Sequence, residues 1–159
     1  SAGNSEAGHL NIGAGRVVLQ DDVRLDSALT DGSFFTNKVF LQTFDEVKTR
    51  GKSLHLIGLL TKKSSHGSID YPLALLKMAK KAGLEKVYLH LIFDGRSTEP
   101  GSAPALLEKL EHQMQEIGVG QIATGIGRGI ALDRDGNYTK IKKAYEALTA
   151  GTGHCAGDC

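Results

Sequence analysis

The sequence contains little cysteine, no excess of charge of either sign and no long apolar run. It carries two cysteines and a formal net charge of +1 in 159 residues. No apolar run approaches the roughly 18 residues that a membrane-spanning helix needs. The small net charge gives no field that would draw the chain to nucleic acid or to a membrane surface. No signal-peptide pattern is present either, so we expect a cytoplasmic protein with neither kind of partner.

Both cysteines lie in the last residues of the chain, beside His154. A disulfide between Cys155 and Cys159 would join residues only four positions apart. A metal site with His154 would need more ligands than this segment supplies. Unpaired thiols are therefore the interpretation we prefer. The glycines around them predict a flexible tail over residues 152–159.

The residues that are present suit one α/β domain with its own core. Three apolar runs predict buried strands, at residues 53–59, 86–93 and 121–125. Apolar residues at helical spacing follow each run, at residues 69–79, 103–117 and 141–148. This alternation predicts βαβ units that form a parallel sheet flanked by helices. An N-terminal helical segment over residues 21–51, broken at Asp31-Gly32, precedes the sheet.

Finer signals set the expected ends of the helices and the expected core. We expect Ser68 and Ser102 to cap two helices, and Gly83 and Gly118 to end them. The phenylalanines of residues 34–44 are expected in the core. His55 and His90 lie inside predicted strands, where hydrogen-bonded histidines of the core or sheet edge are more common than ligands.

The most informative segment reads GNSEAGHLNIGAGR, over residues 3–16. Gly3 and Asn4 favour a sharp turn that places Ser5 at the start of a helix. Free backbone N–H groups and the helix dipole at that position stabilise a phosphate, whether bound there or formed on the serine. The alternative is a capping serine without chemistry, which spacing alone favours.

Polar segments follow all three predicted strands, at residues 61–68, 94–100 and 127–135. Because the carboxyl ends of parallel strands meet at one edge of the sheet, we expect these loops to converge there. Arginine forks in such loops match phosphate and carboxylate oxygens. A single arginine of this kind is more often solvated, but three converging loops favour a site for a small phosphorylated carboxylate.

These segments resemble the cofactor-independent (2,3-bisphosphoglycerate-independent) phosphoglycerate mutases of the alkaline phosphatase superfamily. The family pattern G-N-S-E-V-G-H, then L-N-I-G-A-G-R-V-V, differs from residues 3–9 only at Ala7. The pattern D-G-R-D-T-x-P is similar to residues 94–100, and G-R-Y-Y-A-M-D-R-D to residues 127–135. Matched segments extend from about residue 3 to residue 151.

The resemblance implies a role for six residues. Ser5 would accept the phosphoryl group and also ligate a metal ion. The substrate-binding residues would be His66, Arg96, Ser97, Arg128 and Arg134. The implied reaction interconverts 3-phosphoglycerate and 2-phosphoglycerate through a phosphoserine, in glycolysis and gluconeogenesis. It implies two divalent metal ions, typically manganese, in a full-length protein that we expect to be a cytoplasmic monomer.

The resemblance also implies a division of the chain. Residues 1–20 would belong to the phosphatase-like domain, and residues 21–151 to part of the inserted substrate-binding domain. We expect this chain to be a fragment that holds no catalytic metal and is inactive alone, because the other family ligands lie outside it.

Departures from the family pattern affect the groups around the substrate more than the arginines. Ser97 stands where the family has aspartate, and Gly129-Ile130 where it has two tyrosines. The first loop reads Thr61-Lys62-Lys63-Ser64-Ser65 and begins where the family has S-D-G-G. Two alternatives therefore stay open: a phosphate-ester-binding or regulatory module without turnover, or a superfamily relative that acts on another phosphorylated small molecule.

Overall fold

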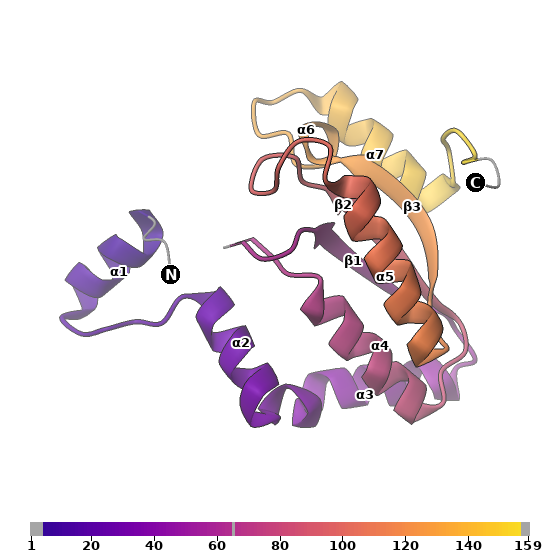
Figure 1. The fold of residues 1–159 in the computed structure, drawn as a ribbon, viewed down its shortest axis with the longest axis horizontal. Helices are drawn as coiled ribbons and strands as arrows, with labels where there is room; N and C mark the ends of the chain where they lie inside the picture. Colours follow the sequence, from indigo (N-terminus) through magenta and orange to yellow (C-terminus); the bar gives the residue numbers. More distant parts are fainter. Residues whose placement is uncertain (1–4, 65, 157–159) are drawn as a thin grey trace.

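The computed structural model describes residues 5–64 and 66–156 (Figure 1). The predictions for Gly3, Asn4, Ser65 and Cys159 concern residues outside these ranges. The elements in chain order are α1 (Ser5–Ala14), α2 (Asp21–Asp31), the 3₁₀ helix η1 (Ser33–Thr36), α3 (Lys38–Thr49), β1 (Leu54–Leu60), α4 (Asp70–Ala82), β2 (Val87–Phe93), α5 (Ala103–Ile117), β3 (Gln121–Gly127), α6 (Arg128–Ala131) and α7 (Tyr138–Ala150).

The three strands form one parallel sheet in the order β1-β2-β3. Leu54 pairs with Val87 at the start of β1, and Leu60 pairs with Phe93 at its end. Helix α4 connects β1 to β2, and α5 connects β2 to β3. The predicted α/β class with a helical start is thereby confirmed. None of the helices in the described ranges has the length and apolar composition that crossing a bilayer requires.

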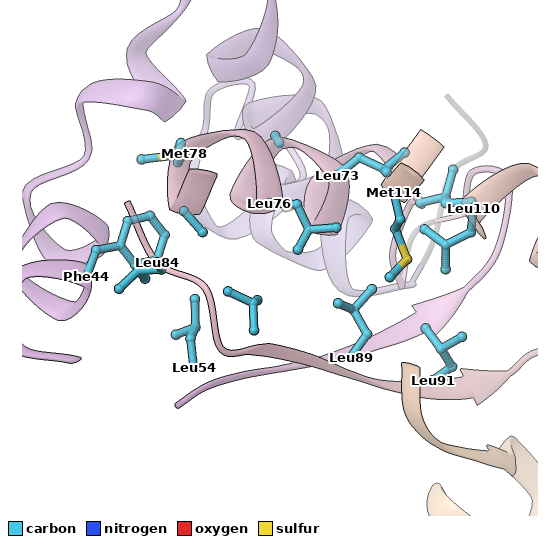
Figure 2. Packing of buried hydrophobic residues seen from close by; sticks show 14 of the residues in the cluster. Phe44, Leu54, Leu73, Leu76, Met78, Leu84, Leu89, Leu91, Leu110 and Met114 are labelled. Atoms are coloured by element: carbon cyan, nitrogen blue, oxygen red, sulfur yellow. The ribbon is translucent and has the colours of Figure 1, made fainter. Parts of the chain in front are cut away.

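The core lies between the sheet and the two connecting helices, as Figure 2 shows. Leu76 of α4, Leu110 of α5 and Leu89 of β2 are among the largest fully buried side chains. Burying one such side chain contributes about 1.5–3 kcal/mol. The phenylalanine prediction holds in part, because Phe34 and Phe44 are buried while Phe35 is 40% exposed.

The opposite face of the sheet carries a chain of polar side chains. Nδ1 of His55 lies 2.9 Å from Nε2 of His90, whose Nδ1 lies 2.9 Å from the Thr124 hydroxyl. His90 is buried, and burial, together with the charge of His55, lowers its pKa. Both histidines are therefore hydrogen bonded within the sheet, as their position in the strands predicts. Ile57 of β1 is 62% exposed, so apolar surface remains on this face of the sheet.

The two predicted glycine ends are confirmed, but the two predicted serine caps are not. Gly83 and Gly118 follow α4 and α5 with φ of 77° and 72°, the left-handed conformation that glycine adopts without strain. The prediction for Ser68 is wrong, because Ile69 is the N-cap residue of α4 and no side chain of the described residues caps this helix. The Ser68 hydroxyl, one position earlier, accepts a hydrogen bond from the Asp70 N–H at 3.2 Å. The prediction for Ser102 is wrong, since its hydroxyl donates back to the Glu99 carbonyl at 2.6 Å. Its backbone is already helical, so the hydroxyl cannot cap the next turn.

Helix α1 lies apart from the sheet, at the left of Figure 1. Within α1 only Ala7 is buried, whereas Ile12 is 83% exposed. Helix α2 is held closer to the sheet by polar contacts with the loop after β1, described below. The chain therefore divides into a packed α/β part and a first helix with little burial of its own.

Candidate functional site

The loops that follow the three strands meet in one groove at the carboxyl edge of the sheet. This groove has a volume of about 650 Å³. It is lined by His66, Arg96, Arg128, Gly129, Leu132, Asp133, Arg134, Asp135 and Lys140. The parallel sheet dictates this arrangement, because all three strands end at the same edge. Four of the predicted substrate-binding residues thus lie together.

Of the four predicted residues in the groove, Arg96 and Arg134 have guanidinium groups that are available to an anion. In the described part of the chain, no hydrogen bond or ion pair is made by the guanidinium of Arg96 or of Arg134. Each guanidinium offers five N–H donors in a planar fork. Two unpaired cations in one hollow are suited to a ligand with more than one anionic oxygen.

Arg128 is held differently, by a buried carboxylate. Its Nη1 forms an ion pair with Asp94, and the two side chains are 17% and 0% exposed. A second oxygen of Asp94 accepts a hydrogen bond from the Ser97 N–H at 3.1 Å. Burial acts to raise the pKa of Asp94, but the hydrogen bonds from Arg128 and from the Ser97 backbone hold it below its usual value. Asp94 is therefore an anion inside the protein.

A second carboxylate, Asp133, holds the segment after β3. It accepts a hydrogen bond from the Asn137 N–H at 2.9 Å and faces the Lys140 ammonium at 3.4 Å. The Asn137 hydrogen bond and the Lys140 charge outweigh burial and lower the pKa of Asp133. These contacts of Asp133 restrain the segment that contains its neighbour Arg134.

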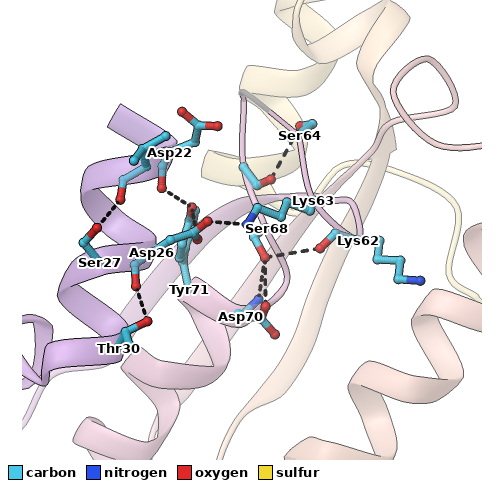
Figure 3. Close-up of polar contacts among 12 residues, drawn as sticks. Asp22, Asp26, Ser27, Thr30, Lys62, Lys63, Ser64, Ser68, Asp70 and Tyr71 are labelled. Carbon is cyan, nitrogen blue, oxygen red and sulfur yellow. Dashed lines mark hydrogen bonds and ion pairs between the residues drawn. The ribbon is translucent and has the colours of Figure 1, made fainter. Parts of the chain in front are cut away.

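One lysine of the loop after β1, Lys63, contributes to the fold. Figure 3 shows Lys63 pointing to α2, where it forms an ion pair with Asp26. The Tyr71 hydroxyl donates to the same carboxylate at 3.0 Å. The contact with Lys63 and the hydroxyl lower the pKa of Asp26, while burial and this anion raise the pKa of Tyr71 to about 12. Lys63 therefore joins α2 to the loop and does not line the groove.

Ser97 and Ser5, the other two predicted site residues, do not line the groove. Ser97 lies in the β2–α5 loop beside Arg96, and its backbone bonds to Asp94. Ser5 lies on α1, where Nδ1 of His9 is 3.3 Å from its hydroxyl and donates to its carbonyl at 2.6 Å. The structure thus does not bring Ser5 to the arginines.

A metal ion at Ser5 needs further ligands. The ranges that the structure describes contain no group of three or more His, Cys, Asp or Glu side chains that could hold a metal ion. Among the described residues, the His9 ring lies beside the Ser5 hydroxyl, and its nearer nitrogen already donates to the Ser5 carbonyl. The residues present do not fit a divalent metal site, and any such site would take ligands from other residues. Cys155 is an exposed free thiol.

Sequence reasoning gave no role to Asp94, Asp133 or Lys140. Asp94 and Asp133 stand in the segments predicted to form the site, but the partner of each depends on side-chain placement. The Asp94–Arg128 pair joins residues 34 positions apart. For Asp94 a partner could have been predicted, because a carboxylate at the end of a buried strand needs a cation or several N–H donors nearby.

Comparisons with known proteins place this chain in a family. A family model described as the BPG-independent PGAM N-terminus matches residues 25–158. A 2,3-bisphosphoglycerate-independent phosphoglycerate mutase of Clostridium perfringens (strain SM101 / Type A) is 47% identical over 154 residues, which cover 97% of this chain and 30% of that protein.

Two further enzymes of the same name give the same result. The Moorella thermoacetica protein is 46% identical over 97% of this chain, and that of Escherichia coli O1:K1 / APEC is 43% identical over 98%. The chain spans about 30% of the length of each of these relatives. On the extent of these matches, the chain belongs to the 2,3-bisphosphoglycerate-independent phosphoglycerate mutase family, in the region of its N-terminal family model.

Proposed function

We propose that the groove binds phosphoglycerate and that the chain is the substrate-binding part of a phosphoglycerate mutase. The observation that carries this proposal is the meeting of His66, Arg96, Arg128 and Arg134 in one groove. Arginine forks bind phosphate and carboxylate oxygens bidentately, and phosphoglycerate carries both groups. The relatives named above are mutases for this substrate by their printed names.

We further propose that Ser5 is the nucleophile in a full-length protein. Its oxygen would attack the phosphorus of 3-phosphoglycerate as the bond to the glycerate oxygen breaks. The glycerate, held by the groove, would reorient, and the phosphoryl group would return to the other hydroxyl. Two divalent ions, manganese by resemblance, would activate the serine when bound, with their ligands outside the described residues.

The finer assignments belong to the same proposal. We place the full-length protein in glycolysis and gluconeogenesis, as a cytoplasmic monomer without nucleic-acid or membrane partners. The net charge of +1 on these 159 residues supports the last point for this part of the protein, because it provides no long-range attraction to polyanions.

Titration of the chain with 3-phosphoglycerate tests the groove. Replacing Arg96, Arg128 or Arg134 with alanine should each cost about 1.5–3 kcal/mol of binding free energy, or roughly 10- to 150-fold in affinity. Arg50→Ala is the matched control, because Arg50 is 69% exposed and lies at the end of α3, before β1 begins. Unchanged affinity in all three groove variants would remove the site.

The role of Ser5 needs the longer protein. After incubation with 3-phosphoglycerate and manganese, the intact mass of a full-length protein should show one added phosphate that Ser5→Ala abolishes. We expect no such addition on the 159-residue chain. A stable phosphate on Ser5 of that chain would mean that it carries a complete site.

The departure at Ser97 can be tested in the same full-length protein. The family aspartate at this position would accept hydrogen bonds from a glycerate hydroxyl. If Ser97 weakens that contact, Ser97→Asp should raise mutase activity. A protein that is fully active with Ser97, and not improved by aspartate, would show that the departure is neutral.

A second function, binding without turnover, has its own supporting observation. The groove is formed by the packed α/β part, whereas Ser5 lies on the separate helix α1. A phosphate-ester-binding or regulatory module needs only the first of these. Mutase and phosphatase assays of the full-length protein with manganese separate the two functions. Phosphatase activity without mutase activity would instead favour a relative that acts on another phosphorylated molecule.

A further inference from the structure

A buried carboxylate borders a groove that we propose to bind anions, which is electrostatically unfavourable. Asp94 has a side chain with no exposed surface, and it makes an ion pair with the groove residue Arg128. Coulomb repulsion between this carboxylate and a bound phosphate weakens binding. Asp94 must therefore contribute something else if the site is to benefit from it.

The contacts of Asp94 indicate what it contributes. One oxygen pairs with Nη1 of Arg128, on the segment that follows β3. The other accepts from the Ser97 N–H, in the loop that follows β2. The Arg96 backbone also contributes a hydrogen bond that favours the ionised carboxylate. A single carboxylate thus ties together the two segments that carry Arg96 and Arg128.

The geometry of a guanidinium makes such a tie useful. Arg128 has five N–H donors in one plane, and Asp94 takes its donor at Nη1. With one edge fixed, the remaining donors keep a defined direction toward the groove. Immobilising a long side chain ahead of binding removes an entropic cost from the binding step. Arg96, which has no such partner among the described residues, keeps the freedom to follow the ligand.

We propose that Asp94 is a positioning residue, which increases affinity for the phosphate ester by fixing Arg128 and the β2–α5 loop. This rests on the proposed function, since it takes the groove to be the phosphoglycerate site. Asp94 touches no ligand in this proposal. Its effect on binding passes through Arg128 and the backbone of residues 96–97.

The direction of the change in affinity distinguishes a positioning role from a simple effect of charge. Asp94→Asn and Asp135→Asn each remove one negative charge beside the same groove, and Asp135 lines it directly. Charge alone predicts tighter binding of 3-phosphoglycerate for both variants. Positioning predicts about tenfold weaker binding for Asp94→Asn, and tighter binding only for Asp135→Asn. The proposal would be overturned if the wild type binds 3-phosphoglycerate and Asp94→Asn binds it equally well or more tightly.

A double-mutant cycle identifies the route of the effect. In an Arg128→Ala background, Asp94→Asn should lose much less additional affinity than it does alone, because the residue it acts through is gone. In an Arg134→Ala background the two losses should add. Additive losses in both backgrounds would contradict the route through Arg128.

Two further measurements keep the result decisive. If Asp94→Asn does not fold, Asp94→Glu retains the charge but displaces the guanidinium, and it too should weaken binding. The Arg128 side-chain Nε–Hε signal in nuclear magnetic resonance should be sharp in the wild type and broadened in Asp94→Asn without any ligand. Should the wild type fail to bind 3-phosphoglycerate, the proposed function fails, and this signal alone decides whether Asp94 fixes Arg128.

Discussion

The groove and helix α1 carry the two halves of the proposed chemistry, and they differ in how firmly the protein holds them. At the groove, Asp94 and Asp133 are buried carboxylates that fix the segments bearing Arg128 and Arg134. On α1, the hydrogen-bond partner of the Ser5 hydroxyl among the described residues is the exposed His9 ring, and Ala7 is the buried residue of this helix. Among the proposed binding groups, the Arg128 guanidinium is held in place within this chain, whereas the proposed nucleophile would need other residues to hold it.

The largest test of this difference compares the two parts through their apolar residues. Leu76→Ala leaves a cavity in the core beneath the sheet and should reduce the free energy of unfolding by about 2–5 kcal/mol. Ile12→Ala removes a side chain that is 83% exposed on α1, and should change it by no more than about 0.5 kcal/mol. Urea unfolding followed by circular dichroism measures both. Equal losses would show that α1 is packed as firmly as the sheet.

Glycine substitutions give the next largest contrast, with opposite signs. At Gly120, φ is 107° and an added Cβ would lie 2.9 Å from Leu76. Gly120→Ala should therefore cost about 2–4 kcal/mol of stability. Gly8 lies within α1 with no other atom near its missing Cβ, so Gly8→Ala should favour that helix by about 0.5–1 kcal/mol. Thermal unfolding and helical ellipticity test the pair, and a stable Gly120→Ala variant would contradict the packing described.

Acidification should remove the contribution that ionised Asp94 makes to the stability of the groove. The folded pKa of Asp94 lies below the unfolded value of about 3.9, so its contribution to stability is present above that pH. It is lost as the pH falls through the folded pKa. Asp94→Asn should cost about 1–3 kcal/mol at pH 7 and less near pH 3, because the pH has then fallen below the unfolded pKa. Urea titrations at both pH values measure this, and an equal cost at each would mean that Asp94 is not ionised when folded.

The smallest expected effect concerns His90 on the other face of the sheet. Burial lowers its folded pKa, so folding disfavours the protonated ring. The free energy of unfolding should then be unaffected by this group above the unfolded histidine pKa of about 6.5, and should fall as the pH drops below it. His90→Gln should remove part of the decline between pH 7.5 and 5. An undiminished decline in that variant would assign it to other groups.

The sequence predicted the elements and the location of the groove better than it predicted the details inside it. Apolar periodicity fixes the strands, and parallel strands place His66, Arg96 and Arg134 at one edge whatever their rotamers. The Asp94–Arg128 pair joins residues 34 positions apart and depends on the side chains, which no local pattern encodes. The same holds for Lys63, whose ammonium finds Asp26 on another helix instead of the groove. Ser102 failed as a cap because its backbone continues the helix.

The strand order has a consequence for the side chains that can reach a ligand. Because β1, β2 and β3 are successive neighbours, the loops that follow them start at fixed intervals of about 4.8 Å. The loops after β1 and β3 thus begin roughly 10 Å apart at the level of the backbone. Only long side chains can cross that distance from both loops, and the groove is lined by Arg96, Arg128, Arg134 and Lys140. The spacing of the strands therefore sets the side-chain reach that any small ligand in this groove would require.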